Sequence, residues 1–373
     1  MDYRNLLSLL GKDGEVRKIQ FTGRSTYILS LPKKWIQEMH IKPGDPVDVV
    51  REANSSLSII PHAERSSNLS NEATAVVLEK EGVTSVQRKV ISIYLSGYNI
   101  IHLKSKTGRI SPAQRDAVRE VIRRNLVGTE IIADSSDAIT IQVLLTLPEL
   151  SVNTAVRRMF LIASSMHKDA MLALGESNHE LAKTVIKSDD EVDRFSLYIL
   201  RNLVIATQNE RVLREIGLKR PADCLGYRVA VKSIERIADH SCGIAENVEE
   251  QQQKISKGLF EKIDKMSKLS LAAVNDSVEA FLRRDYVMAD SVVDKAENIH
   301  SVESEIISIL NKEDKTTSHE PINSTIRLIL EDIRRTAEHA SDIAEAAMNQ
   351  TIGEVITVER IPTISTSTTT PDK

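Results

Sequence analysis

The chain has 373 residues, with 49 Lys and Arg against 53 Asp and Glu and a formal net charge of −4. Single hydrophobic cores usually stop growing well below this length, so we expect more than one domain. The charge balance excludes a protein that is basic over its whole surface, although it allows a local basic face. Two cysteines are too few for a disulfide framework, which is typical of a reducing cytoplasm.

Short strands are predicted at the N-terminus, because apolar and polar residues alternate through much of 16–60. One short helix, PKKWIQEMH, interrupts them and begins at Pro32. The order is strand, strand, helix, strand, strand within a domain assigned to 1–62. Because so small a unit buries little apolar surface alone, we expect a homodimer to complete its core.

Basic side chains cluster in this first domain. Between 16 and 34 there are five of them and no acid: Arg17, Lys18, Arg24, Lys33 and Lys34. Such a patch predicts salt-dependent contacts with DNA phosphates, while Gln20 and Arg24 are the candidates for reading base edges. The alternative is a solvated strand edge that is kept basic to discourage aggregation.

A polar linker, AERSSNLSNE, precedes a second domain at 73–147. Its pattern predicts strand, helix, strand, helix, strand, strand, which is a small α/β layer domain. Ser111 and Pro112 predict the start of its second helix, as N-cap and first helical residue. We find no glycine-rich phosphate loop and no catalytic constellation in it, so its role stays open.

The remaining chain is helical in pattern from 152 to about 349, with breaks that predict six helices. Segment 171–203 matches 278–310, and 235–246 matches 334–345, which indicates two three-helix repeats at 152–251 and 256–349. The tail, 354–373, has a composition typical of disorder. No run of 18 apolar residues occurs, so we expect no membrane insertion and a cytoplasmic protein.

Carboxylates fall on a predicted apolar helix face in the first repeat. Asp189 and Asp193 point inward, and Glu235 and Asp239 share one flank of the next helix by i, i+4 spacing. A buried, unpaired carboxylate is costly, so this placement predicts a cation. Four converging carboxylates would suit Mg²⁺, Ca²⁺, Mn²⁺ or iron. The alternative is ion pairing with nearby arginines: Arg194, Arg201, Arg228 or Arg236.

The second repeat departs from this pattern. Ala296, His300 and Arg334 stand where the first repeat has Asp189, Asp193 and Glu235. A weaker second metal site is therefore predicted from the remaining candidates: His300, Glu303, Glu338 and Asp342. His240 and His339 follow the acids in both repeats, where each either completes a hydrogen-bond network or binds metal.

These motifs resemble the PhoU family of phosphate-uptake regulators. The residues that carry the resemblance are the pair Asp189 and Asp193 and the run ERIADHSCGIAE at 235–246. The resemblance covers both repeats, over 152–349. The resemblance implies repression of phosphate acquisition when phosphate is plentiful. It also implies metal ions bound by the acidic motifs on the bundle surface.

The first domain resembles the AbrB/MazE-like swapped-hairpin DNA-binding domains. The resemblance rests on RKIQFTGRSTYILSLPKKWIQEMHIKPGDPVDVV at 17–50 and covers about 14–61. It implies that two chains interleave into one DNA-binding dimer.

The predicted fold class is multidomain α+β: a small β-rich swapped-hairpin head, a small α/β middle domain and a C-terminal pair of three-helix bundles. The predicted function is a phosphate-responsive transcriptional regulator that binds the operator of phosphate-related genes and a divalent or iron-type metal ion. The alternative is an adaptor that binds no DNA and docks on a phosphate transporter or sensor kinase. A metalloenzyme would need a nucleophile and oxyanion donors, which the sequence does not supply, so we expect no enzyme.

Overall fold

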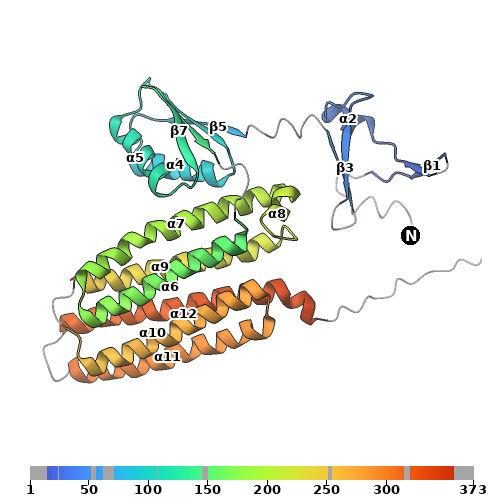
Figure 1. The fold of residues 1–373 in the computed structure, drawn as a ribbon. Helices are drawn as coiled ribbons and strands as arrows, with labels where there is room; N and C mark the ends of the chain where they lie inside the picture. Colours follow the sequence, from blue (N-terminus) through green and yellow to red (C-terminus); the bar gives the residue numbers. More distant parts are fainter. Residues whose placement is uncertain are drawn as a thin grey trace, which may run out of the picture. The chain divides into compact units, whose positions relative to one another are not determined.

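The computed structural model describes residues 15–356, apart from 24, 52–55, 62–70, 107, 145–149, 251–253 and 315–319. The chain divides into two compact units, Met1–Asn71 and Glu72–Lys373, whose elements are labelled in Figure 1. Among the helices of the described residues, none is long and apolar enough to cross a membrane. Cys224 and Cys242 are buried free thiols.

The first unit contains two antiparallel hairpins separated by a short helix. Its elements are β1 (Gln20–Thr22), β2 (Thr26–Ile28), α2 (Lys33–Glu38), β3 (Val47–Arg51) and β4 (Leu57–Pro61). The turn after β1 uses Gly23 at φ +64°, a left-handed conformation that glycine adopts without steric cost. The apolar side chains of β1 and β2 stay open to solvent, since Phe21 is 60% and Tyr27 71% exposed.

The middle domain, at the start of the second unit, is a four-stranded sheet with two helices. Its elements are β5 (Glu72–Val77), α4 (Val83–Leu95), β6 (Ile100–Ser105), α5 (Pro112–Arg124), β7 (Thr129–Asp134) and β8 (Ala138–Val143). The strand order is β5-β6-β8-β7, with β5 parallel to β6 and the other pairs antiparallel. One apolar cluster joins the sheet to both helices. Ser111 caps α5 in a reciprocal capping box with Gln114.

In the rest of the second unit, the described residues form six long helices and one short helix. They are α6 (Val152–Glu176), α7 (His179–Gln208), α8 (Glu210–Glu215), α9 (Asp223–Glu250), α10 (Lys257–Arg283), α11 (Tyr286–Asp314) and α12 (Glu320–Val355). The short α8 was not predicted. Because α12 ends at Val355, the predicted tail overlaps the last turn of helix, and its residues from 357 lie outside the described part of the chain.

The two helical repeats have the same junction. The residue directly after α6 is Ser177, with φ of 54°, and the residue directly after α10 is Arg284, with φ of 60°. Both are left-handed C-cap residues, and they are 107 positions apart, as are the first residues of α7 and α11. The sequence offset therefore corresponds to one structural unit used twice.

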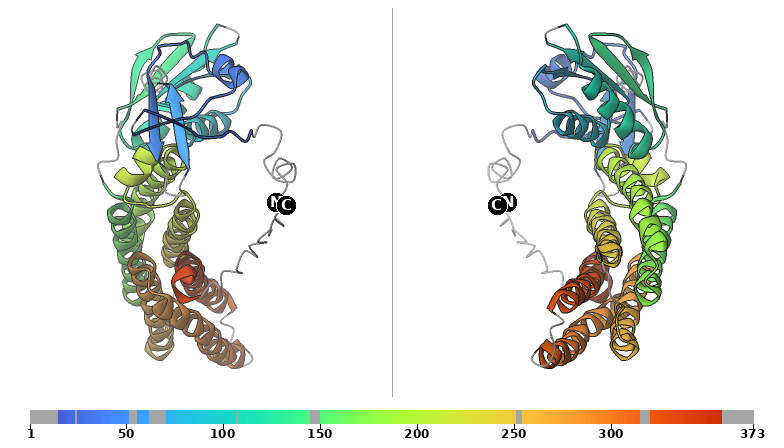
Figure 2. Two further views of the ribbon diagram at one scale, coloured as in Figure 1. Left: turned by 90° about the vertical axis from the view of Figure 1, so that its right-hand side faces the viewer. Right: turned by 90° about the vertical axis from the view of Figure 1, so that its left-hand side faces the viewer.

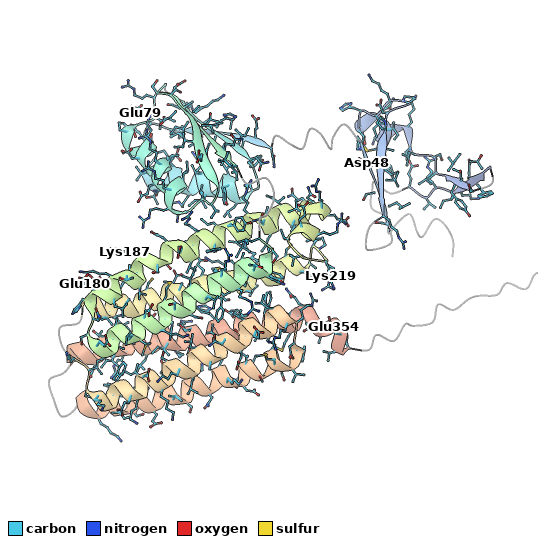
Figure 3. All side chains as sticks on the ribbon, viewed as in Figure 1. Asp48, Glu79, Glu180, Lys187, Lys219 and Glu354 are labelled. Atoms are coloured by element: carbon cyan, nitrogen blue, oxygen red, sulfur yellow. The ribbon has the colours of Figure 1, made fainter. Side chains whose placement is uncertain are left out.

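The repeats pack through α9 and α12 (Figure 2). One continuous apolar core runs through both three-helix groups. The approach is close: a Cβ added at Gly243 would lie 2.7 Å from Asp332 Oδ2 of α12. Helix α7 is amphipathic, with Val185 and Val192 buried, whereas Glu180 and Lys187 lie on its outer surface (Figure 3). These contacts confirm the predicted fold class of small hairpins, α/β domain and paired helical bundles.

The middle domain and α7 are joined by polar contacts. Arg201 is 4% exposed and donates to the Gly97 carbonyl at 3.0 Å, to Asn99 Oδ1 at 2.8 Å and to the Tyr94 carbonyl. Its guanidinium also lies 4.7 Å from the centre of the Tyr94 ring. In the first half of α7, Asp190 accepts hydrogen bonds of 2.8 and 3.1 Å from the guanidinium group of Arg124 of α5.

Candidate functional site

The predicted DNA-contacting residues lie on open surface in the first unit. Arg17, Lys18, Gln20, Lys33 and Lys34 are all exposed, and Gln20 begins β1. Arg17 pairs with Glu15, and Lys34 lies 3.6 Å from Glu38. Arg24 lies outside the described residues. The described members of this set are therefore available to solvent on β1, on the segment before it and on α2.

The first predicted metal set comes from two neighbouring helices of one repeat. Asp189 and Asp193 lie on α7, and Glu235 and Asp239 lie on α9, which packs against α7. Asp189 and Asp193 are partly buried, the Glu235 side chain is 16% exposed and Asp239 is exposed. The cluster therefore lies at the edge of the bundle, partly withdrawn from water.

Two of these carboxyl groups, Asp189 and Asp193, have a raised pKa. Burial, with the charges of Asp193, Asp239 and Glu235, raises the pKa of Asp189 to about 7. Burial, with the charges of Glu235 and Asp239, raises the pKa of Asp193 to about 6, although Lys232 acts in the opposite sense. Such shifts occur when anionic groups share a site with too little compensating positive charge.

Arginines do not neutralise this cluster. Over the described residues, none of the four acids forms an ion pair with an arginine; Glu235 contacts Lys232. Asp189 Oδ1 is buried and has no hydrogen-bond partner. Of the arginines considered as partners, Arg201 binds the middle domain instead, and Arg194 Nε is buried without an acceptor.

The donor set fits a hard cation. Carboxylate oxygens are the preferred ligands of Mg²⁺, Ca²⁺ and Mn²⁺, and a buried unpaired Asp189 oxygen is the kind of atom such an ion would stabilise. The described side chains contain no group of three or more His, Cys, Asp or Glu already arranged as a ligand set. Binding would therefore require rotation of these side chains.

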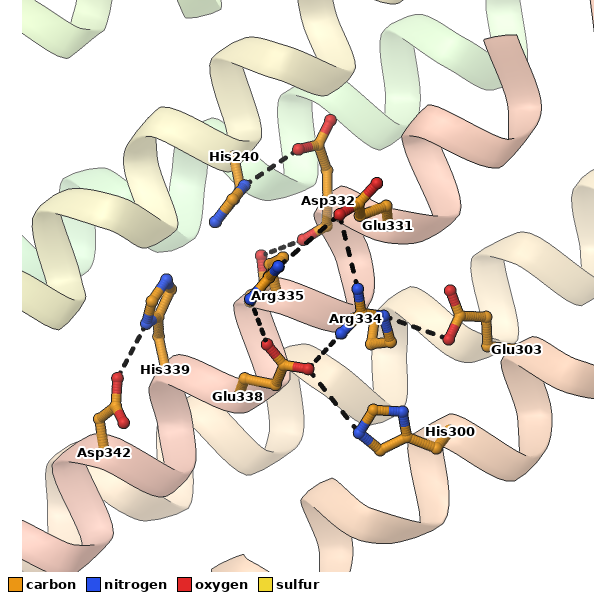
Figure 4. A network of polar contacts seen from close by, with 11 residues as sticks. His240, His300, Glu303, Glu331, Asp332, Arg334, Arg335, Glu338, His339 and Asp342 are labelled. Atoms are coloured by element: carbon orange, nitrogen blue, oxygen red, sulfur yellow. Dashed lines mark hydrogen bonds and ion pairs between the residues drawn. The ribbon is translucent and has the colours of Figure 1, made fainter. Parts of the chain in front are cut away.

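The second predicted set is organised differently (Figure 4). Arg334 of α12 lies 3.3 Å from Glu303 and contacts Glu338, and His300 lies 3.8 Å from the same Glu338. Asp342 does not join them, because its Oδ2 lies 3.0 Å from His339 Nδ1. A guanidinium thus stands among three of the four predicted ligands, at the position where the first repeat has Glu235.

The two histidines complete hydrogen-bond pairs at the contact between repeats. His240 of α9 pairs with Asp332 of α12 at 2.9 Å, and the imidazole rings of His240 and His339 stack with centres 5.4 Å apart. The hydrogen bond from His339 holds the pKa of Asp342 below its usual range. Each histidine therefore forms a hydrogen-bond pair in the structure, and metal binding by either one stays a prediction.

Sequence reasoning missed the contacts between α7 and the middle domain. Arg201 was considered only as a partner for the bundle acids, although its charged group reaches carbonyl oxygens at the end of α4 and beyond. The available signal was a basic residue beside the apolar residues Ile199, Leu200 and Leu203 in sequence. It did not identify the partner, because backbone acceptors in another domain leave no sequence pattern.

The helical fold is a tandem of three-helix domains of one type. The PhoU domain family matches residues 156–248 and again 263–347. A second family, described as antidote-toxin recognition MazE, bacterial antitoxin, matches residues 20–67. Two stretches of the chain therefore match the PhoU domain model behind a segment that matches the MazE model, which confirms both resemblances.

Curated relatives match part of this chain. A phosphate-specific transport system accessory protein PhoU homolog of Aquifex aeolicus is 30% identical over 145 residues, which are 36% of this chain and 62% of the relative. Homolog 1 of Thermotoga maritima is 27% identical over 51% of this chain and 80% of its own length. The homolog of Caulobacter vibrioides is 25% identical over 57% of this chain and 92% of its own.

Solved structures are similar in fold. PhoU from Pseudomonas aeruginosa has a TM-score of 0.50 at 19% identity, covering 54% of this chain and 96% of that one. The phosphate transport system regulatory protein PhoU from Streptococcus pneumoniae gives a TM-score of 0.48 at 21% identity, over 56% and 96%. At such identities the similarity to the Pseudomonas protein concerns the fold alone.

Proposed function

We propose that this chain is a phosphate-responsive transcriptional regulator, which binds DNA through its first unit and a metal ion through its first PhoU domain. The observation that carries the proposal is the combination of two PhoU domains with a basic MazE-like segment in one chain. The relatives named above are accessory proteins of the phosphate-specific transport system. Their role supports a phosphate-related signal, and the basic segment supports DNA as the target.

Homodimerisation through the first unit is part of this proposal. Phe21, Tyr27, Val49 and Leu57 each leave 60% or more of their surface exposed on hairpins too short to cover them. Burying such residues against a second copy would supply the missing core, at about 25 cal/mol for each Å² of apolar surface. The dimer would also bring two sets of basic residues together on one assembly.

Metal binding is proposed for the first acid set alone. Asp189, Asp193, Glu235 and Asp239 are the residues that would hold the ion, whose positive charge would offset their mutual repulsion. In the second set Arg334 already supplies positive charge to Glu303 and Glu338. A bound ion affects DNA binding only if the DNA-competent and incompetent states bind it unequally.

A mobility-shift titration tests the DNA proposal. With promoter DNA of a phosphate-uptake operon, the wild-type protein is expected to bind with an affinity that falls steeply as salt rises. Arg17→Ala/Lys18→Ala removes up to four phosphate contacts per dimer and should lower the slope of log affinity against log salt by about 3 to 4. Lys42→Ala, an exposed head lysine outside the basic cluster, is the matched control. A folded dimer that binds no DNA at low salt would favour the adaptor alternative.

Elemental analysis tests the metal proposal. We expect purified wild-type protein to contain a divalent or iron-type metal, and Asp189→Ala/Glu235→Ala protein to lose most of it, because two of four carboxylate ligands are gone. Glu191→Ala, an exposed acid on the same helix, is expected to retain the metal. Equal metal content in wild type and the double variant would remove the proposed site.

A further inference from the structure

A cavity of about 360 Å³ lies in the middle domain, at residues that the proposed function does not use. It opens where the sheet meets the start of α5. Its polar lining comes from α5, from the loop before α5 and from the turn between β7 and β8: Arg109, Arg115, Arg119, Asp134, Ser135 and Ser136. Ile110 and Pro112 add apolar surface.

The topology places this cavity at one particular edge of the sheet. Strand β6 ends at Ser105 and β7 ends at Asp134, while β8, antiparallel to both, begins at Ala138 between them. Helix α5 starts at the same edge, after the loop that follows β6. Open α/β sheets bind ligands outside the carboxyl ends of their strands, where a following helix also presents its positive dipole end.

The loops around the cavity are fastened in place. The Ser105 hydroxyl donates to the Arg109 carbonyl at 2.9 Å and accepts from the Arg109 amide at 3.0 Å. The Ile110 amide donates to the Ser136 carbonyl at 2.9 Å. Gln114, 1% exposed, ties the first turn of α5 to the Leu78 and Glu81 carbonyls at 3.0 and 2.8 Å. The lining is therefore held before any ligand arrives, which lowers the entropy cost of binding.

Positive charge exceeds negative charge in this lining. Three arginines face one carboxylate, Asp134, which contacts Arg115 and lies 2.8 Å from Arg119. Arg109 is exposed and makes no ion pair with any part of the chain that the structure describes. The Arg115 side chain is only 16% exposed and also donates to the Ser135 carbonyl, so it is positioned within the wall.

We infer that this cavity binds the phosphoryl group of a small phosphate-bearing molecule. Planar guanidinium groups match phosphate oxygens with paired hydrogen bonds, and a convergent set of arginines is the usual way to hold such an anion. Asp134 orients Arg115 and Arg119, which leaves Arg109 to contact the ligand directly. The volume lies at the lower end of the range for small-molecule sites, which favours a small ligand over a polymer.

This site is independent of the acid cluster on α7 and α9, because its residues all lie between 109 and 136. It adds a second ligand to the proposed function: an anion bound in the middle domain, beside the metal ion proposed for the helical bundle.

Calorimetric titration of the full chain in the presence of a chelator tests the inference, since chelation prevents phosphate from binding through a metal ion. Three probes are compared: inorganic phosphate, a nucleoside diphosphate and tripolyphosphate. We expect at least one to bind the wild type, and Arg109→Ala and Arg119→Ala each to weaken that binding by about tenfold or more. Arg123→Ala, an exposed arginine of α5 outside the cavity, is expected to bind like wild type.

If one probe binds most tightly, that probe identifies the source of the phosphoryl group. If all three bind with equal affinity, the phosphoryl anion alone is recognised. The Arg109 side chain makes no hydrogen bond or ion pair with the residues that the structure describes, so its variant is expected to fold, which circular dichroism checks. The inference is overturned if no probe binds the wild type, or if Arg109→Ala and Arg119→Ala bind as tightly as Arg123→Ala.

Discussion

Asp189→Asn is expected to make the chelator-treated protein more stable at pH 8 and to leave its stability near pH 4 unchanged. The pKa of Asp189 is about 7 in the folded protein, against about 4 for an unfolded aspartate. Between these values the folded state holds a proton that the unfolded state releases. The free energy of unfolding contributed by this group is therefore fully present below pH 4 and is lost as pH rises through 7.

Asparagine has nearly the same shape and carries no charge, so the variant avoids that loss. A displacement of about three pKa units corresponds to roughly 2 to 4 kcal/mol once partial exposure is allowed for. Asp193, with a pKa of about 6, contributes in the same direction over a narrower range.

Urea unfolding at a series of pH values measures this difference directly. Glu191→Gln, which changes an exposed acid two residues after Asp189 on α7, is expected to give the wild-type pH profile. Adding a divalent cation should stabilise the wild type more than Asp189→Asn, because the cation binds the folded carboxylates. Parallel stability curves for wild type and Asp189→Asn would contradict the description of a strained acid cluster.

Arg201→Ala is expected to loosen the contact between α7 and the middle domain and to cost about 2 to 4 kcal/mol of stability. The substitution removes three hydrogen bonds from a buried charged donor, to the Tyr94 and Gly97 carbonyls and to Asn99. It also takes a donor from the Gly97 carbonyl and from Asn99 Oδ1, whereas the Tyr94 carbonyl keeps the Gly97 amide as a donor at 3.1 Å. Loss of a donor from a buried acceptor is costlier than the loss of an exposed hydrogen bond. The packing of the guanidinium on the Tyr94 ring is lost as well.

Hydrogen exchange and urea unfolding report this change together. Exchange is expected to accelerate at the end of α4 and in residues 94–99, whereas α10 and α11 should keep their protection. The control is Arg211→Ala, which removes an exposed arginine paired only with Glu215 within the short α8. If Arg201→Ala and Arg211→Ala gave the same unfolding midpoint, the contacts of Arg201 would not stabilise the packing of α7 against the middle domain.

Local patterns in the sequence predicted most of the architecture. Alternation of apolar residues marked the short strands, and Ser111 followed by Pro112 marked the start of α5, where the structure has it. The offset of 107 residues predicted the duplicated helices. Helix α8 was missed because six residues at the end of α7, after an Asn209 cap, are too few to show a helical period.

The candidate site was predictable only in part. Wheel positions placed Asp189 and Asp193 on the inner side of α7 and Asp190 on the outer side, and the structure agrees. The alignment of the repeats grouped Asp342 with His300, Glu303 and Glu338, but in the structure Asp342 pairs with His339, its i, i+3 neighbour on α12. A wheel fixes directions around one helix, whereas the meeting of side chains depends on how two helices cross, which sequence does not state.

Two adjacent residues of α7, Asp189 and Asp190, have different partners. Movement of the acid cluster on α7 and α9 is therefore coupled to movement of the middle domain. Asp189 faces the acids of α9, while Asp190, one residue later, is gripped by Arg124 of the middle domain. Consecutive side chains leave a helix about 100° apart, so neither can be reoriented by rolling the helix without moving the other. A rotation of α7 about its axis that moved Asp189 toward an ion would therefore also move Asp190. That movement would displace Arg124 and the middle domain to which it belongs.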